Sequence, residues 1–178
     1  MKKRKKNIKQ NIKHRYLEIF IRYSILLVLG FLSFQFYKIL QPITFYSIFG
    51  ILKPFYSIEI IDIFLAIDKT YFIEIIPSCV AASAYLLLIA LNLSIPMNKK
   101  QRIYSLTFSI LSFFILNLLR IIILTVLFVN EYILFESIHE FSWYVLSTIF
   151  VVVIWLLSVK IFKIKSIPIY SDILFLKS

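Results

Sequence analysis

Apolar residues dominate the chain in four long segments that are separated by more polar stretches. The segments run about Ile19 to Leu40, Ser78 to Ile95, Ile103 to Val129 and Phe141 to Phe162. A helix of about 20 residues crosses a hydrocarbon core of about 30 Å, so each segment has roughly the length of a membrane span, the second being the shortest. The pattern therefore predicts an all-α membrane protein, built as a bundle of about four transmembrane helices.

The stretch between the first two segments predicts further structure outside the membrane. Ile43 to Lys53 is apolar but too short to span, so we expect an interfacial or re-entrant segment there. Ile58 to Leu65 and Tyr71 to Ile76 are rich in isoleucine and aromatic residues, with Asp68-Lys69-Thr70 between them. This pattern favours a β-hairpin over an amphipathic helix. A hairpin lying over the helix ends would shield non-helical backbone from lipid.

Composition excludes several classes of protein. Of the 178 residues 61% are hydrophobic and only 16% charged, which argues against a soluble enzyme and against a disordered chain. Gly30 and Gly50 are the only glycines, so glycine-rich nucleotide loops are excluded. One cysteine and two histidines cannot form a disulfide framework, a Cys-x-x-Cys site or a three-histidine metal cage. We therefore expect no metal and no cofactor.

The distribution of charge predicts the topology. The net charge is +11, but the basic residues gather in residues 1–22, in Asn98 to Arg102 and in the tail from Lys160. The positive-inside rule makes all three cytoplasmic and argues against nucleic acid as a partner. We expect a multi-pass protein of the cell membrane with both termini in the cytoplasm. Its predicted parts are a basic arm, 1–18, an integral membrane domain, 19–162, and a cytoplasmic tail, 163–178.

Cys79 is the first residue that does not fit the role of lipid-facing filler. It follows Pro77 and Ser78 at the start of the second segment, where Ser78 is a good N-cap and Cys79 falls in the first helical turn. A helix N-terminus favours a thiolate, which is the nucleophilic form of cysteine. The alternative is that Cys79 is a small apolar residue in a membrane interior.

Arg120 is the second, because it lies within an apolar segment and not at its end. It is about 25 Å along the helix from Ile103, in the outer leaflet, and such charges usually face the bundle interior or a wet cavity. Asn117 is one turn earlier on the same face. The alternative is that the Arg120 side chain extends outward to the lipid headgroups.

His139 is the third, at the outer mouth of the fourth segment between Glu136 and Trp143. Histidine titrates near neutral pH and can carry a proton, although an exposed loop histidine is the simpler interpretation. The topology brings Cys79, Arg120 and His139 to one membrane face. A thiol, an imidazole and a guanidinium together suit acyl transfer, as nucleophile, proton carrier and oxyanion stabiliser.

In this order and topology the chain resembles the exosortase/archaeosortase family. The matching stretches are Ile75-Ile76-Pro77-Ser78-Cys79-Val80-Ala81-Ala82-Ser83, Asn117-Leu118-Leu119-Arg120-Ile121 and Ile138-His139-Glu140-Phe141-Ser142-Trp143. They lie within about half of the chain. Family members often have Cys-Thr-Gly or Cys-Ser-Gly at the nucleophile, where this chain has Cys79-Val80-Ala81. The short chain is closer in length to the archaeal branch.

The resemblance implies a cysteine-type protease and transpeptidase embedded in the membrane. Its substrates would be exported proteins with a C-terminal tripartite sorting signal. The enzyme would cleave near that signal through a thioester on Cys79 and transfer the new carboxyl end to a membrane anchor, with a membrane lipid as acyl acceptor. Cys79, Arg120 and His139 take the catalytic roles, with Asn117 and Ser78 supporting them.

Other interpretations remain open. The chain is alternatively a non-enzymatic membrane scaffold or assembly subunit whose polar residues lock helices together. A serine protease using Ser78 or Ser83 with His139 lacks the Gly-x-Ser-x-Gly elbow. A transporter is disfavoured because no paired broken helices or repeats are visible in the sequence.

Overall fold

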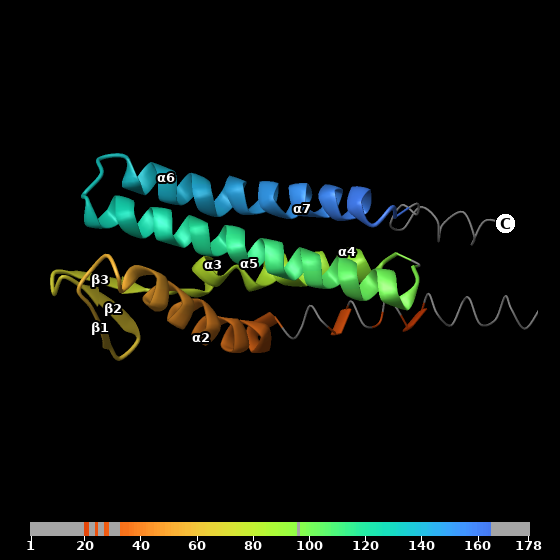
Figure 1. Ribbon diagram of the computed structural model, residues 1–178, viewed down its shortest axis with the longest axis horizontal. Helices are drawn as coiled ribbons and strands as arrows, with labels where there is room; N and C mark the ends of the chain where they lie inside the picture. The colour runs from red at the N-terminus through yellow and green to blue at the C-terminus, as the bar shows by residue number, and fades with distance from the viewer. Residues whose placement is uncertain (1–19, 22–23, 25–26, 29–32, 96, 165–178) are drawn as a thin grey trace, which may run out of the picture.

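The computed structural model describes residues 20, 21, 24, 27, 28, 33–95 and 97–164. The predicted basic arm, residues 1–18, lies outside these residues, and so does the predicted tail after residue 164. The described chain is mostly helical. A small three-stranded antiparallel sheet lies at one end of the helices (Figure 1).

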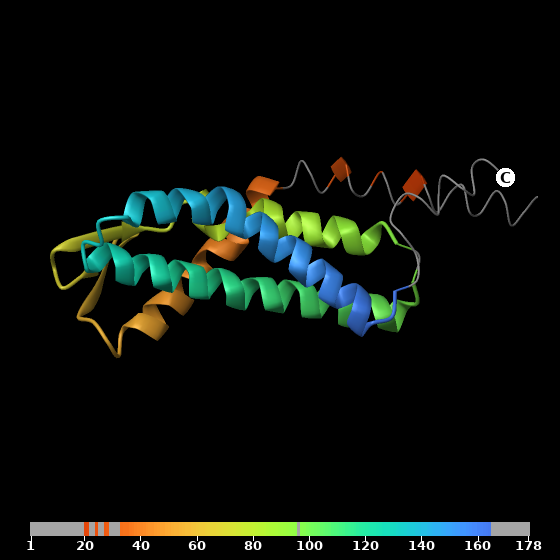
Figure 2. The same cartoon turned by 90° about the horizontal axis from the view of Figure 1, so that it is seen from above.

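Two long helical elements form the body of the molecule and are long and apolar enough to cross a membrane. The first is α5, Lys99–Val129. The second is a continuous rod made of α6 (Phe135–Phe141), the π-helix η1 (Ser142–Leu146) and α7 (Ser147–Ile161). The rod crosses α5 obliquely (Figure 2). The third predicted segment is thus confirmed as one helix, whose 31 residues extend about 46 Å, beyond a hydrocarbon core of about 30 Å.

The fourth segment begins earlier than predicted, at Phe135 instead of Phe141. The stretch between the third and fourth predicted segments is therefore helical from Phe135 onward. The chain leaves α5 through Glu131, whose φ of 49° is in the left-handed region and ends the helix. As a result His139 lies on a helix and not in a loop.

The opposite faces of α5 are chemically different. Its exposed stripe is formed by Leu111, Ile115, Leu119 and Ile123, which recur every four residues. The face toward the other helices carries the buried Asn117 and Arg120, together with small polar residues nearer the N-terminus of α5. A continuous exposed apolar stripe of this kind is typical of a surface covered by lipid.

The second segment forms two helices instead of one. These are α3 (Pro77–Val80) and α4 (Ala82–Leu93), separated by Ala81 in a left-handed conformation with φ 54° and ψ 42°. The prediction that Ser78 caps the helix is wrong, because the N-cap is Ile76 and Pro77 occupies the first helical position. Proline has the preset φ and lacks the N–H that a first turn leaves unpaired, so it starts the helix without a side-chain cap.

The stretch Ile43 to Lys53, expected to lie in the interface or to re-enter the membrane, is not a separate element. Helix α2 runs without interruption from Ser33 to Leu52 and includes Pro42. The prediction relied on proline as a helix breaker. The buried side chains of Phe45, Ile48 and Leu52 recur at helical spacing on the core side, and burying this stripe outweighs the local preference.

The predicted hairpin is confirmed, with one strand more than expected. Strands β1 (Ile58–Ile61), β2 (Phe64–Ile67) and β3 (Tyr71–Glu74) form an antiparallel meander in the order β1-β2-β3. The stretch predicted as a single strand is split by Asp62, which has a φ of 55°. Aspartate tolerates the left-handed region better than most residues, so a tight turn forms there.

The sheet is attached to the helices through its apolar face. Ile58, Leu65, Ile67 and Ile75 are buried in one cluster with residues of α2, with Val80 of α3 and with Leu118 and Ile121 of α5. A second cluster joins α4, α5 and α7. The first cluster surrounds the residues that lead from β3 into α3, and this fixes the position of Cys79 relative to α5.

Candidate active site

A cavity of about 190 Å³ lies at the sheet end of the molecule, between β3, α5 and α6. Most of its lining is apolar, from isoleucine, leucine and phenylalanine side chains. Four lining residues can take part in polar chemistry: Glu74, Cys79, Thr125 and His139. They come from different elements, so the tertiary structure assembles the site.

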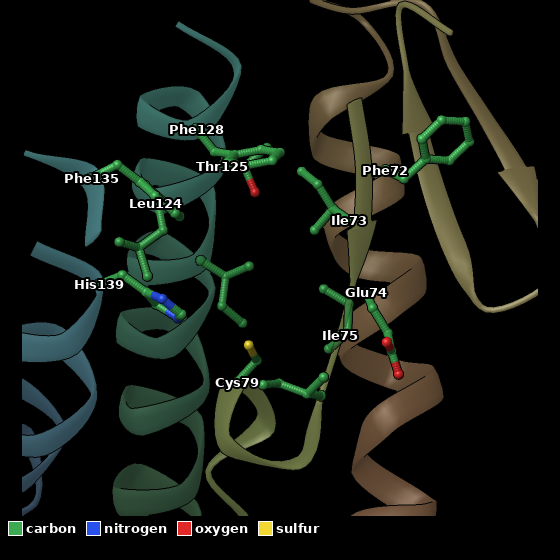
Figure 3. Close-up of a pocket in the computed structure, with 12 residues that line it drawn as sticks. Phe72, Ile73, Glu74, Ile75, Cys79, Leu124, Thr125, Phe128, Phe135 and His139 are labelled. Carbon is green, nitrogen blue, oxygen red and sulfur yellow. The ribbon is translucent and has the colours of Figure 1, made fainter. Parts of the chain in front are cut away.

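Cys79 and His139 share this cavity although 60 residues separate them. Figure 3 shows the sulfur of Cys79 and the ring of His139 both pointing into it, from α3 and α6. Both side chains are half-buried. Two of the three predicted catalytic residues therefore line one cavity.

The orientation of His139 comes from an aromatic contact. Its ring stacks on Phe135 one turn earlier in α6, with centroids 5.5 Å apart and an interplanar angle of 14°. Among the residues that the structure describes, the imidazole has no hydrogen bond to a carboxylate or carbonyl that would select its tautomer. Stacking therefore holds the plane of the ring and leaves both ring nitrogens available for proton transfer.

Arg120 lies behind the cavity and does not face lipid, since only 6% of its surface is exposed. Its Nη2 donates hydrogen bonds to the carbonyl oxygens of Ser78, at 3.3 Å, and Cys79, at 3.1 Å. Its Nη1 donates to the hydroxyl of Ser147 on α7. The guanidinium thus holds the main chain of the Cys79 turn against two other helices.

Asn117 acts on the same turn from one helical turn earlier in α5. Its Nδ2 donates to the carbonyl oxygen of Cys79 at 2.9 Å and to that of Val80 at 3.4 Å. The side chain is 1% exposed. The prediction that Asn117 and Arg120 share a face is confirmed, and both use it to bind main-chain carbonyls.

The break at Ala81 explains why donors are needed here. A helix end leaves its last carbonyls without intrahelical donors, and buried carbonyls without partners are costly. The Ala81 N–H bonds the carbonyl of Pro77 at 3.2 Å, which closes the single turn of α3. Asn117 and Arg120 supply donors to the three carbonyls that follow, from Ser78 to Val80. The turn that carries the thiol is therefore stabilised from outside.

The π-helix η1 aligns His139 with Ser147. Eight residues of regular α-helix would rotate Ser147 about 80° past His139 around the helix axis. A π turn accommodates about one extra residue, so these eight positions cover nearly two whole turns. His139 can then face the cavity while Ser147 faces Arg120. Neither Ser147 nor the π turn has a recognisable signal in the sequence.

Two polar atoms of this group have no partner among the described residues. They are Nε of Arg120 and Oδ1 of Asn117, and both are buried. Nε–H therefore remains as an unused donor for the oxyanion role predicted for Arg120, while Nη1 and Nη2 bond Ser78, Cys79 and Ser147.

Ser78 and Ser83 point to the other side of the turn. They line a second cavity of about 310 Å³ between α3, α4 and α7, together with Trp143 and Ser147. His139 does not line this second cavity. A serine nucleophile paired with His139 therefore receives no support from this arrangement.

Tyr71 links β3 to the C-terminal end of α5, beside the first cavity, through a hydrogen bond and a ring contact. Its hydroxyl donates to Oε1 of Glu131 at 2.8 Å, and its ring meets that of Phe128 edge to face at 5.8 Å. The hydrogen bond to the Glu131 carboxylate raises the pKa of the Tyr71 phenol above its usual value. This contact sets the distance between the strand and the helix that form the cavity walls.

The chain was compared with models of protein families, with curated proteins and with solved structures, and none of them matches it.

Proposed function

We propose that the protein is a cysteine protease and transpeptidase of the cell membrane. The observation that carries the proposal is the shared cavity, into which the Cys79 thiol and the His139 imidazole both point. The motif-level resemblance to the exosortase/archaeosortase family supports it. Substrates would be exported proteins with a C-terminal tripartite sorting signal.

The chemistry follows from the residues at the cavity. The Cys79 sulfur attacks a peptide carbonyl while His139 takes the thiol proton, and the carbonyl oxygen becomes an oxyanion. His139 then protonates the leaving amine, the C–N bond breaks, and a thioester remains on Cys79. A nucleophile on a membrane lipid attacks the thioester, gives its proton to His139 and releases the thiol. Arg120 would hold the turn that carries Cys79 and would stabilise the oxyanion with its positive charge.

The membrane setting is part of the proposal. Lys99, Lys100 and Arg102 lie at one end of α5, and the sheet and cavity lie at the other end (Figure 1). With cytoplasmic basic residues the cavity faces outward, where exported proteins arrive. Four spans, counted from the first apolar segment, α3–α4, α5 and the α6–α7 rod, then give both termini a cytoplasmic location.

The direct test is to express each variant together with a tagged exported protein that carries such a signal, from the same genome. Cys79→Ala should abolish the shift of the substrate to its processed form while the protein still accumulates in the membrane. Intact mass measurement of the wild type should detect an acyl adduct that hydroxylamine removes, as expected for a thioester. Normal processing by Cys79→Ala would refute the proposal.

A scaffold is the second candidate, and one feature favours it. Buried polar side chains bridge three helices away from the cavity: Asn92 of α4 bonds Ser105 of α5 at 2.7 Å, and Ser105 bonds Ser158 of α7 at 2.7 Å. Hydrogen bonds of this kind lock helices together in lipid. A scaffold should tolerate Cys79→Ser in every assay, whereas the enzyme should not.

A further inference from the structure

The outer edge of β3 is open next to Cys79. Among the described residues, β3 pairs with β2 on one side only. Residues from Phe72 to Ile76 line the cavity in succession, so the cavity runs along the strand's free edge and not over one face of the sheet. Figure 3 shows β3 on one side of the cavity and α5 on the other, with Cys79 at one end.

The register identifies the main-chain groups at this edge. The N–H of Asp68 bonds the carbonyl of Ser57 just before β1, so Ala66 and Phe64, two and four positions earlier, also bond toward β1. The alternate residues of β2 then bond toward β3.

Through these alternate residues, Leu65 and Ile67, β2 bonds to Ile73 and Tyr71. The N–H and C=O groups of Phe72 and Glu74 are left facing the open edge.

This edge has little of the protection that exposed strands usually have. Free edges normally carry charged residues, lysine above all, or proline or a bulge, because unpaired main-chain groups recruit other strands. The segment Tyr71-Phe72-Ile73-Glu74-Ile75-Ile76 has neither lysine nor proline, Glu74 is its one charged residue, and Phe72 is 54% exposed. Main-chain groups in such apolar surroundings need partners, which an added strand would supply.

We propose that the free edge of β3 binds the substrate as an extended, mostly apolar peptide, which adds a fourth strand and presents its carbonyl to Cys79. The inference rests on the proposed function, because this peptide is the acyl donor. An extended chain about 4.8 Å from β3 can bond the open edge, whereas a helix uses its main-chain N–H and C=O groups internally and cannot. Its side chains would meet Ile121, Leu124 and Phe128 of α5.

The test uses the single thiol of the full-length protein in detergent. The probes are two capped hexapeptides of alternating valine and threonine that end in a chloromethyl ketone, which alkylates Cys79 with loss of chloride. One is N-methylated at its odd residues and the other at its even residues. A peptide strand bonds β3 through one set of N–H groups, so one reagent should label Cys79 about tenfold more slowly than the other. Equal rates would overturn the proposal.

A pair of proline variants locates the edge. Phe72→Pro removes an N–H that points to the open edge, and such a proline is tolerated there because it breaks no bond to β2. In this variant the ratio between the labelling rates of the two reagents should fall about three- to tenfold, the effect of one hydrogen bond. Ile60→Pro is the matched control, because Ile60 faces the free edge of β1, away from the cavity. It should leave the difference unchanged, and an equal loss in both variants would contradict the proposal.

Two further controls separate this inference from the proposed function. Phe72→Ala keeps the main-chain N–H and removes only the side chain. Labelling with iodoacetamide normalises the labelling rate of each variant for the reactivity of Cys79.

Alkylation of Cys79 does not require catalysis. Edge-dependent labelling together with normal processing by Cys79→Ala would therefore refute the transpeptidase and leave a peptide-binding edge. Processing that depends on Cys79 without edge-dependent labelling would refute only the docking mode.

Discussion

The guanidinium of Arg120 binds the main-chain oxygen of Cys79, at a distance of 3.1 Å from Nη2. A residue predicted to stabilise charge on a substrate is thus bonded to the turn that carries the candidate nucleophile. This arrangement gives Arg120 a measurable structural role, whatever it contributes to a reaction.

Arg120→Lys is expected to lower both stability and processing. Lysine keeps the charge but cannot reach the carbonyls of Ser78 and Cys79 and the hydroxyl of Ser147 together. Buried carbonyls left without donors should reduce the free energy of unfolding by about 1–3 kcal/mol. Loss of an oxyanion donor would slow processing about 100- to 1000-fold. Thermal unfolding in detergent and a processing time course measure the two effects, and an unchanged unfolding midpoint would contradict the structural role.

His139→Ala should act on the rate alone. Among the residues that the structure describes, the His139 ring stacks on Phe135 and makes no hydrogen bond, so the unfolding midpoint should change little. Processing should fall at least about 100-fold, the low end for a positioned acid–base group. His14→Ala changes the other histidine, in the basic arm, and should process normally. A clear fall in the unfolding midpoint together with the slower processing would assign His139 a role in packing instead.

Ala81→Gly should stabilise the protein. A left-handed conformation costs a non-glycine residue about 1–2 kcal/mol, and Ala81 has a φ of 54°. Ala84→Gly, inside the regular helix α4, should instead destabilise by about 1 kcal/mol. Chemical or thermal unfolding of the two variants should give shifts of opposite sign, and shifts of the same sign would contradict the strain at Ala81.

The Tyr71 contact predicts a dependence on alkaline pH. Because the hydrogen bond to Glu131 raises the pKa of the phenol, its stabilising effect is complete below the unfolded value of about 10 and is lost as pH rises through the higher folded value. Wild type should therefore be more stable than Tyr71→Phe at neutral pH, and the difference should vanish above the folded pKa. Unfolding midpoints across the alkaline range measure this. Tyr104→Phe, at an exposed position on α5, is the control.

Topology can be tested with reporter cysteines in a Cys79→Ala background. Asn98 precedes α5 at the basic end, and Asp68 lies in the β2–β3 turn at the opposite end of the molecule. A membrane-impermeant maleimide should label a cysteine at position 68 from outside intact cells, and one at position 98 only after permeabilisation. Labelling of both positions from the same side would refute the proposed orientation and with it the external location of the cavity.

Much of the fold follows from local pattern. Long apolar segments can satisfy their main-chain groups only as helices in an apolar setting, so the helical character of α5 and α7 was predictable, as was the strand character around Asp68-Lys69-Thr70. The burial of Arg120 was predictable for a related reason, because an unpaired charge in lipid is costly.

Tertiary structure decided the rest, because it depends on packing between distant parts of the chain. Pro42 remains inside α2 because Phe45, Ile48 and Leu52 pack on the sheet and α5. The bonds from Asn117 and Arg120 stabilise a turn that local preference would not form at Ala81. No pattern of neighbouring residues encodes such contacts. The bonds from Asn117 and Arg120 reach residues about 40 positions earlier in the chain, and for that reason the hydrogen bonds that hold the Cys79 turn could not be predicted from the sequence.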